Sequence, residues 1–317
     1  MTVRTVAPAR PNRIGAGILF MLVAGGMSAG MSAFGRGATQ EFSFMEVVFF
    51  RFLLALVPPV VIGLASGGLA ALRTQDKRLV IGCGVLQTVT FITYFISVHL
   101  LPLNDAIVLS FANAPFIALL SGPFLKERVT PQRWAAVIGG FLGIVVIANP
   151  GGGGLLSVGA IAAIVSAACS GTTWMMVRRW GTGESSFALT AGMLSVGSVI
   201  CALLMPFFWT APFWETANLG GWTMLIMVGL FGGAAQLPMG HAYRIAPTAA
   251  VAPFYYSAEV FAFFIAWAVW GELPGWRTVI GCAMIVGAAV YLGVHESMAA
   301  RRRAQAQAQA NTTAGGA

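Results

Sequence analysis

Long apolar runs alternate along this chain with short polar connections. The runs hold 17 to 24 residues, and a helix needs about 20 mostly apolar residues to cross the hydrocarbon core of a bilayer. No connection is long enough to form a separate soluble domain. The pattern predicts ten membrane-spanning helices, at residues 14–33, 43–64, 79–98, 104–124, 132–148, 155–177, 186–209, 219–242, 247–270 and 276–294.

The composition supports an all-α integral membrane protein. Hydrophobic residues make up 58% of the 317 residues and charged residues only 9%, whereas a soluble domain usually has about 25% charged residues. Most of the surface is therefore not expected to face water. The 39 glycines suit close packing between helices in lipid.

The formal charge of +8 does not indicate binding to nucleic acid. The basic residues lie between the apolar runs and are not gathered on one folded face. The four cysteines lie inside apolar runs without the spacing of metal ligands, and the chain has only three histidines. We expect neither a metal site nor a cofactor.

The first apolar run has some features of a signal peptide. It follows Arg4, Arg10 and Arg13 and ends in a stretch of small residues, SAGMSAFG. It is nevertheless long enough to span a bilayer, and the internal repeat described below requires it. We expect an uncleaved first span.

The distribution of basic residues predicts the orientation. If both termini lie in the cytoplasm, 15 of the 18 Lys and Arg residues fall in inner segments and two, Arg36 and Arg277, fall outside. Arg51 lies within a span. Cytoplasmic segments of membrane proteins are enriched in Lys and Arg, so this bias favours an even number of spans with both termini inside.

The two halves of the chain resemble each other. LPLNDAIVLSFANAPF (residues 101–116) aligns with APTAAVAPFYYSAEVF (residues 246–261) at a constant offset of 145. Further on, WAAVIG (134–139) matches WRTVIG (276–281) after a short deletion. The chain therefore holds two copies of one unit.

Each copy holds five of the predicted spans. We expect a first repeat at residues 14–148 and a second at 155–294, between a cytoplasmic N-terminus (1–13) and a disordered cytoplasmic tail (295–317). Because five is an odd number, the second repeat enters the membrane in the inverted orientation. Inverted repeats are characteristic of secondary transporters, whose halves exchange roles as the site opens to either side.

Three stretches carry a resemblance to a known family: EVVFFRFLLALVPP (46–59), LPLNDAIVLSFANAPFIALLSGPFLKERVTPQRWAAVIGGFLGIVVI (101–147) and AYRIAPTAAVAPFYYSAEVFAFFIAWAVWGELPGWRTVIGCAMIVG (242–287). The chain resembles the ten-span EamA-type branch of the drug/metabolite transporter superfamily over residues 14–294. The FFR form of the second span is similar to a subgroup with riboflavin and S-adenosylmethionine carriers. The resemblance implies a metabolite transporter in the bacterial inner membrane, but it does not identify the substrate.

Two strongly charged residues lie deep within predicted spans. Arg51 lies about 12 Å below the outer edge, and Glu259 lies at about the same depth, at ~1.5 Å per residue in a core of ~30 Å. An isolated charge there costs about 2.5–3.5 kcal/mol or more. Either both residues face a central cavity, paired directly or through substrate, or they form a structural ion pair. Glu46 lies on another face of the helix and is expected in the outer headgroup zone.

Polar residues recur on one face of several other spans. A single Ser or Thr usually bonds the backbone of its own helix, so the Gln, Asn and Tyr residues carry more weight. These polar faces imply a common polar interior. Together with Arg51 and Glu259, the residues that we expect to line this cavity are Gln87, Tyr94, Ser110, Asn113, Ser170, Gln236, Tyr255 and Tyr256.

The fifth and tenth spans carry glycines in place of a polar face. We interpret them as packing helices and a possible homodimer interface. The remaining partners that we expect are the lipid bilayer and a small-molecule substrate.

A secondary transporter of a small polar or amphipathic metabolite fits these features best. The chain lacks the GxxxxGK[ST] loop of nucleotide-driven transport. The scarcity of His and Asp argues against a membrane enzyme, and a non-transporting scaffold would be expected to carry a partner domain. A riboflavin or S-adenosylmethionine uptake carrier remains an alternative, and the direction of transport stays open.

Overall fold

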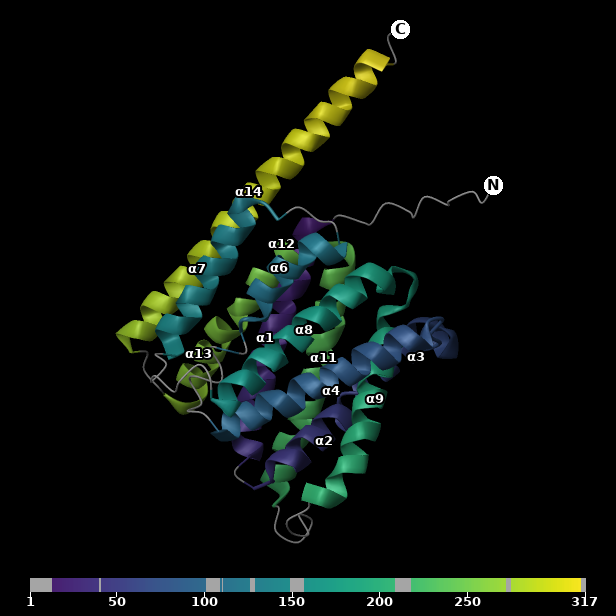
Figure 1. Ribbon diagram of the computed structural model, residues 1–317, viewed down its shortest axis with the longest axis vertical. Coiled ribbons are helices and arrows are strands. Elements are labelled where there is room, and N and C mark those ends of the chain that lie inside the picture. The colour runs from purple at the N-terminus through teal and green to yellow at the C-terminus, as the bar shows by residue number, and fades with distance from the viewer. Residues whose placement is uncertain are drawn as a thin grey trace.

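A computed structural model describes residues 13–39, 41–100, 109, 111–125, 129–148, 157–208, 218–271 and 275–314. Within these ranges the regular elements are helices (Figure 1). They are α1 (Ile14–Ala38), α2 (Phe44–Leu54), α3 (Val57–Ala71), α4 (Lys77–Leu100), α6 (Asn113–Leu125), α7 (Pro131–Ala148), α8 (Val158–Trp180), η1 (Gly181–Gly183), α9 (Ser186–Phe208), α11 (Leu219–Ile245), α12 (Thr248–Val251), η2 (Ala252–Tyr256), α13 (Ser257–Trp270) and α14 (Trp276–Ala314).

Each of the ten predicted spans corresponds to a helix or to consecutive helices in the described residues. Seven segments are long and apolar enough to cross a membrane, and α6 and α7 contain shorter apolar helices. The prediction of an all-helical membrane protein is confirmed. The side of the membrane on which the termini lie stays a prediction.

Prolines divide the second and the ninth spans. Pro58 and Pro59 occupy the first turn of α3, so α2 ends before them at Leu54. A proline lacks an N–H and disfavours helical geometry in the residue before it, so it starts a helix more readily than it continues one. Pro253 lies in the 3-10 segment η2, which separates α12 from α13. Pro115 likewise lies in the first turn of α6.

The packing of the helices repeats between the two halves. α1 packs against α11 and α13, and its counterpart α8 packs against α4 and α6. α2 packs against α11, as α9 packs against α4. Two pairs of counterparts pack against each other, α2 with α9 and α7 with α14. This pattern is that of an approximate two-fold axis relating the repeats.

Two contacts lie close to that axis because their members are equivalent positions. Phe111 and Tyr256, 145 residues apart, pack with ring centroids 5.8 Å apart. Gly143 lies against Ile285, at the offset of the WAAVIG and WRTVIG segments. A Cβ on Gly143 would lie 2.8 Å from the Gly281 carbonyl oxygen and 2.8 Å from the Ile285 side chain. The close approach of α7 and α14 therefore requires glycine at position 143.

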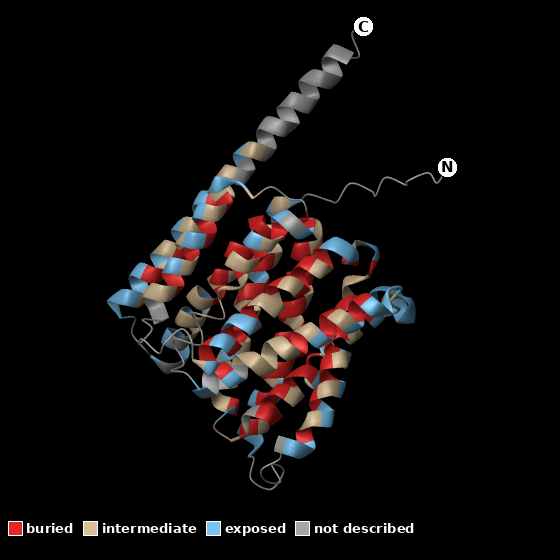
Figure 2. Ribbon diagram, in the orientation of Figure 1, coloured by how far each residue is buried: buried red, intermediate tan, exposed pale blue. Residues whose placement is uncertain are grey.

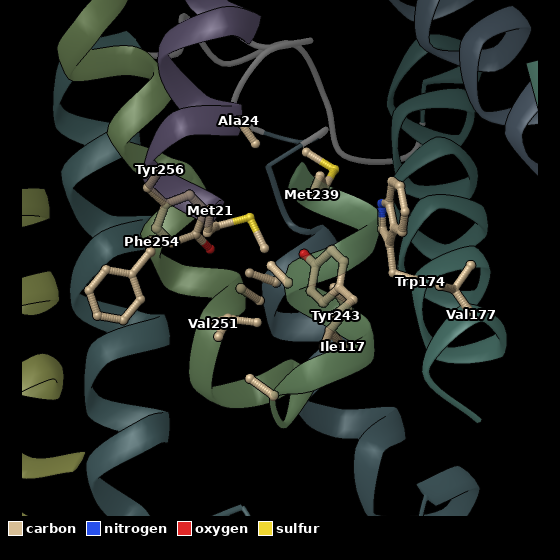
Figure 3. Close-up of a cluster of buried hydrophobic side chains, with 14 of the residues drawn as sticks. Met21, Ala24, Ile117, Trp174, Val177, Met239, Tyr243, Val251, Phe254 and Tyr256 are labelled. Carbon is tan, nitrogen blue, oxygen red and sulfur yellow. The ribbon is translucent and has the colours of Figure 1, made fainter. Parts of the chain in front are cut away.

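The largest buried apolar cluster joins helices of both repeats (Figure 3). Trp174 of α8 stacks on Tyr243 of α11, with ring centroids 5.2 Å apart, and Met21 of α1 lies between Tyr256 and Val251. Exposed apolar side chains lie on the outward faces of helices such as α9 and α14 (Figure 2). Such faces suit contact with lipid tails.

Two local features of the structure were not predicted from the sequence. Glu46 is buried in the capping box of α2, where its carboxylate accepts a hydrogen bond from the Ser43 backbone N–H at 2.8 Å. It is thus a helix cap, and its place in the headgroup zone stays a prediction. We expected a disordered tail from residue 295, whereas α14 continues to Ala314. The tail is rich in alanine and glutamine, which favour helix.

Candidate functional site

Arg51 lies on α2 with only 6% of its surface exposed. Its Nε donates to the Met31 sulfur at 3.3 Å, and its guanidinium carbon lies 3.5 Å from the centroid of the Phe91 ring. Its Nη1 is buried and has no hydrogen-bond partner. The structure therefore surrounds a cation with soft, uncharged groups that leave its charge uncompensated.

Tyr255 lies at the break in the ninth span. Its hydroxyl donates to the Ser28 hydroxyl on α1 at 3.1 Å. The charges of Arg51 and Glu259 are both near enough to act on the Tyr255 hydroxyl, and the charge of Glu259 is near enough to act on that of Tyr94 on α4. One polar centre thus draws side chains from α1, α2, α4 and the α13 region.

Arg51 and Glu259 do not form an ion pair with each other. Both side chains are described, and neither the salt bridges nor the hydrogen bonds of the described residues join them. Glu259 lies in the first turn of α13 and is partly buried. The structural ion pair considered from the sequence is therefore not formed in this conformation.

Two buried glutamines extend the polar centre. Gln87 on α4 and Gln236 on α11 are 6% and 5% exposed, and the Oε1 atom of each has no hydrogen-bond partner. Gly232, one turn before Gln236, lies against Arg51, since a Cβ there would lie 3.7 Å from the arginine Nε. Residues four apart share a helix face, so Gln236 lies on the face of α11 that meets Arg51.

Some hydroxyl groups on the polar faces of the spans bond their own helices. Thr90 donates to the Leu86 carbonyl oxygen and Thr173 to that of Cys169, which confirms the expectation for isolated hydroxyls. Ser166 is different, because its hydroxyl crosses from α8 to the Thr90 carbonyl oxygen on α4 at 2.9 Å. Ser170 follows one turn later and is partly buried.

The other candidates lie away from the charged centre or outside the described residues. Tyr256 is 1% exposed and belongs to the apolar core, where its hydroxyl donates to the Phe111 carbonyl oxygen at 3.4 Å. Asn113 begins α6 beside Gly171 of α8. Ser110 lies outside the described residues.

Sequence analysis missed Phe91 and Met31, which touch Arg51 directly. Phe91 lies four residues after Gln87 and three before Tyr94, so it shares their helix face. That spacing was a usable signal, but Phe and Met occur throughout apolar helices and do not stand out there.

Metal ligands do not gather at this centre. In the described part of the chain, no group of three or more His, Cys, Asp or Glu side chains is placed to hold a metal ion. The four cysteines are free thiols.

Comparisons with known proteins match nearly the whole chain. Residues 15–149 and 157–294 each match the model of the EamA-like transporter family. The chain is 25% identical to the pseudopaline exporter of Pseudomonas aeruginosa (strain UCBPP-PA14), over 87% of this chain and 95% of that protein. It is 26% identical to the riboflavin transporter of Brucella anthropi, over 80% and 89% of the two chains.

Two further matches agree with these. The S-adenosylmethionine uptake transporter of Rickettsia prowazekii is 26% identical, over 82% of this chain and 87% of that protein. A solved crystal structure superposes with a TM-score of 0.76 at 21% identity, over 90% of this chain and 99% of that one. At this identity the superposition supports the fold alone.

Proposed function

Because this chain belongs to the EamA-like transporter family, we propose that it is a secondary carrier whose substrate binds at the polar centre around Arg51. The family is one of transporters, so the protein is a membrane transporter of a metabolite and not an enzyme. The proposed substrate is a small polar or amphipathic metabolite, similar to an amino acid, with an anionic group for Arg51. It moves by alternating access, either ion-coupled or facilitated.

The uncompensated charge of Arg51 is the observation that carries this proposal. Its Nη1 is buried without a partner, and Glu259 is not its ion-pair partner in the described structure. Buried charges within a membrane are costly unless they face water, a counter-charge or a ligand. A substrate anion at Arg51 and a substrate cation or proton at Glu259 remove that cost.

The proposed binding set places the best-supported residues around Tyr255. Arg51 and Glu259 supply charge, Tyr94 and Tyr255 supply hydroxyl groups, and the glutamines 87 and 236 supply amide groups that have unpartnered oxygens. Asn113, Ser170 and Ser110 stay candidates on the neighbouring helices. Tyr256 is proposed to support the site from the core.

Two inverted repeats, residues 14–148 and 155–294, are proposed as the moving units. The two-fold pattern of helix packing supports a mechanism in which the halves exchange conformations. The proposed location is the bacterial inner membrane, with both termini in the cytoplasm. The exposed apolar faces of α7 and α14 are compatible with the homodimer that we propose there.

The relatives define the substrates to test first. A pseudopaline exporter and riboflavin and S-adenosylmethionine transporters are all about a quarter identical to this chain, so none of them fixes the substrate or the direction. Uptake of riboflavin or S-adenosylmethionine is the alternative function. Rescue of a riboflavin auxotroph tests the first of these directly.

Flux into proteoliposomes tests the proposal. The purified protein is reconstituted and screened with radiolabelled amino acids, riboflavin and S-adenosylmethionine, beside a screen of metabolites released by an overexpressing strain. We expect Arg51→Ala and Glu259→Gln each to abolish flux while insertion is normal. Leu53→Ala is the matched control, because Leu53 lies on the same helix and is 39% exposed.

Flux that equals the wild type in both charge variants would contradict the binding site. Absence of flux for every metabolite, with normal reconstitution, would favour a non-transporting scaffold instead.

A further inference from the structure

The contacts of Arg51 fix the orientation of its guanidinium group. A guanidinium group carries five N–H donors in a planar fork. Here one edge is occupied by a thioether, through the 3.3 Å contact from Nε to the Met31 sulfur. A thioether is a weak acceptor without charge, so this contact orients the fork and leaves the positive charge intact.

The face of the guanidinium is covered by an aromatic ring. Phe91 lies with its centroid 3.5 Å from the guanidinium carbon, and Phe52 lies at 5.6 Å. An aromatic face attracts a cation through its quadrupole but accepts no ordinary hydrogen bond. Phe91 therefore fixes the plane of the guanidinium and uses none of its donors.

Phe91 is itself fixed by its neighbour on the Arg51 helix. The rings of Phe52 and Phe91 meet edge to face at 87°, with centroids 5.4 Å apart. Phe52 is fully buried. The ring that supports the guanidinium thus has a defined position before any ligand arrives.

We propose that Phe91 and Met31 are positioning residues, which hold Arg51 so that its terminal nitrogens form a receptor for a carboxylate group. This inference rests on the proposed function and names the group that the site selects. Contacts at the Nε edge and on the ring face leave the Nη end of the fork for the carboxylate. A carboxylate or other partner in place of Phe91 would occupy those donors and close the receptor.

Acetate is the smallest probe of such a receptor, and its binding is measured without knowledge of the transported metabolite. The thermal midpoint of the purified protein is followed as chloride is replaced by acetate at constant ionic strength. We expect the wild type to be stabilised in a saturable manner and Arg51→Ala to show no acetate dependence. A wild-type protein that shows no saturable stabilisation overturns the proposal.

Substitutions at Phe91 separate positioning from packing. Loss of the cation–π contact in Phe91→Leu should raise the apparent Kd for acetate about tenfold, and Phe91→Tyr should restore it. Met31→Leu should have a smaller effect of about threefold, in line with a weak acceptor. Ile96→Ala is the control on the same helix, since Ile96 is 41% exposed.

The midpoint in chloride shows whether each variant is folded. Phe91→Leu with an unchanged Kd for acetate contradicts the positioning role, and so does a failure of Phe91→Tyr to restore binding when its chloride midpoint is normal. Acetate binding without metabolite flux would support the carboxylate receptor and contradict the proposed transport. Flux without acetate binding would support the proposed transport and contradict the carboxylate receptor.

Discussion

Glu184 and Glu41 hold equivalent turns, each of which follows the first helix of its repeat. Glu184, which follows the first helix of the second repeat, accepts hydrogen bonds from the backbone N–H groups of Gln75 and Asp76 at 2.8 and 2.6 Å. Glu41, which follows the first helix of the first repeat, accepts from the Asn218 backbone N–H at 3.2 Å and from its Nδ2 at 2.9 Å. Each carboxylate thus ties its turn to the start of the third span of the other repeat, which is α4 for Glu184 and α11 for Glu41.

The surroundings of the two carboxylates differ. Glu184 is 5% exposed, whereas Glu41 is partly exposed. Beside Glu184, Arg244 at the end of α11 donates to the Ser186 hydroxyl at 2.5 Å and to the Glu184 carbonyl oxygen. The Arg244 carbonyl oxygen in turn accepts from Arg178 of α8 at 2.7 Å. One end of the bundle is therefore joined by an arginine network.

We expect the hydrogen bonds of the two carboxylates to stay formed during transport and the hydrogen bonds of Arg244 to change. If the repeats exchange conformations, each carboxylate takes up the hydrogen-bond distances that the other has here. Both sets of hydrogen bonds are formed in this structure, so both are expected to persist in the other conformation. The contact from Arg244 to Ser186 would correspond to one from the end of α4 to the start of α2. If this end opens during transport, we expect the arginine contacts to break and the two carboxylate ties to remain.

Glu184→Ala should have the largest effect on stability. It removes the carboxylate that accepts hydrogen bonds from the Gln75 and Asp76 backbone N–H groups. Because hydrogen bonds to a charged group are the stronger kind, we expect the free energy of unfolding to fall by about 2–3 kcal/mol. Denaturation in detergent measures this, and Glu184→Gln, which keeps an acceptor oxygen, should lose about 1 kcal/mol. Equal stability of the alanine variant and the wild type would contradict a permanent tie.

Arg244→Ala should change conformation more than stability. Loss of its hydrogen bonds to Ser186 and to the Glu184 carbonyl oxygen lowers the stability of the closed end by about 1–2 kcal/mol. This corresponds to a shift of about 5- to 30-fold in the opening equilibrium. The reporter is the labelling rate of Cys83, which is fully buried on α4, in a chain whose other three cysteines are replaced by alanine. Arg277→Ala is the control, and an unchanged labelling rate in Arg244→Ala would show that this end is not closed by arginine.

Glu41→Ala should have the smallest effect of the three. Because its carboxylate is partly exposed, water replaces part of the lost contact, and we expect a loss of about 1 kcal/mol or less. The same denaturation assay measures it beside Glu184→Ala. A loss as large as that of Glu184→Ala would show that burial does not distinguish the two ties.

The sequence predicts the helices well because hydropathy and length determine which segments can span a bilayer. It also identifies Arg51 and Glu259, since charges are rare within apolar runs. The division of the second span was signalled by Pro58 and Pro59, yet the run remained apolar throughout and was interpreted as one helix.

The environment of these residues depends on tertiary packing. Phe91 and Met31 gain their role only because α1 and α4 bring them to Arg51. Glu184 and Arg244 lie at the ends of helices, where charged residues are ordinary, and their partners are distant in sequence. Composition and periodicity do not identify such pairs.

The contact between Phe111 and Tyr256 offers a fixed reference for measurements of motion. An exchange of the two repeats maps each of these residues onto the other, so their separation is the same before and after. If the repeats exchange conformations, spectroscopic labels at these two equivalent positions would record the same distance in the two end states of the transport cycle. Every other labelled distance could be calibrated against that stationary pair.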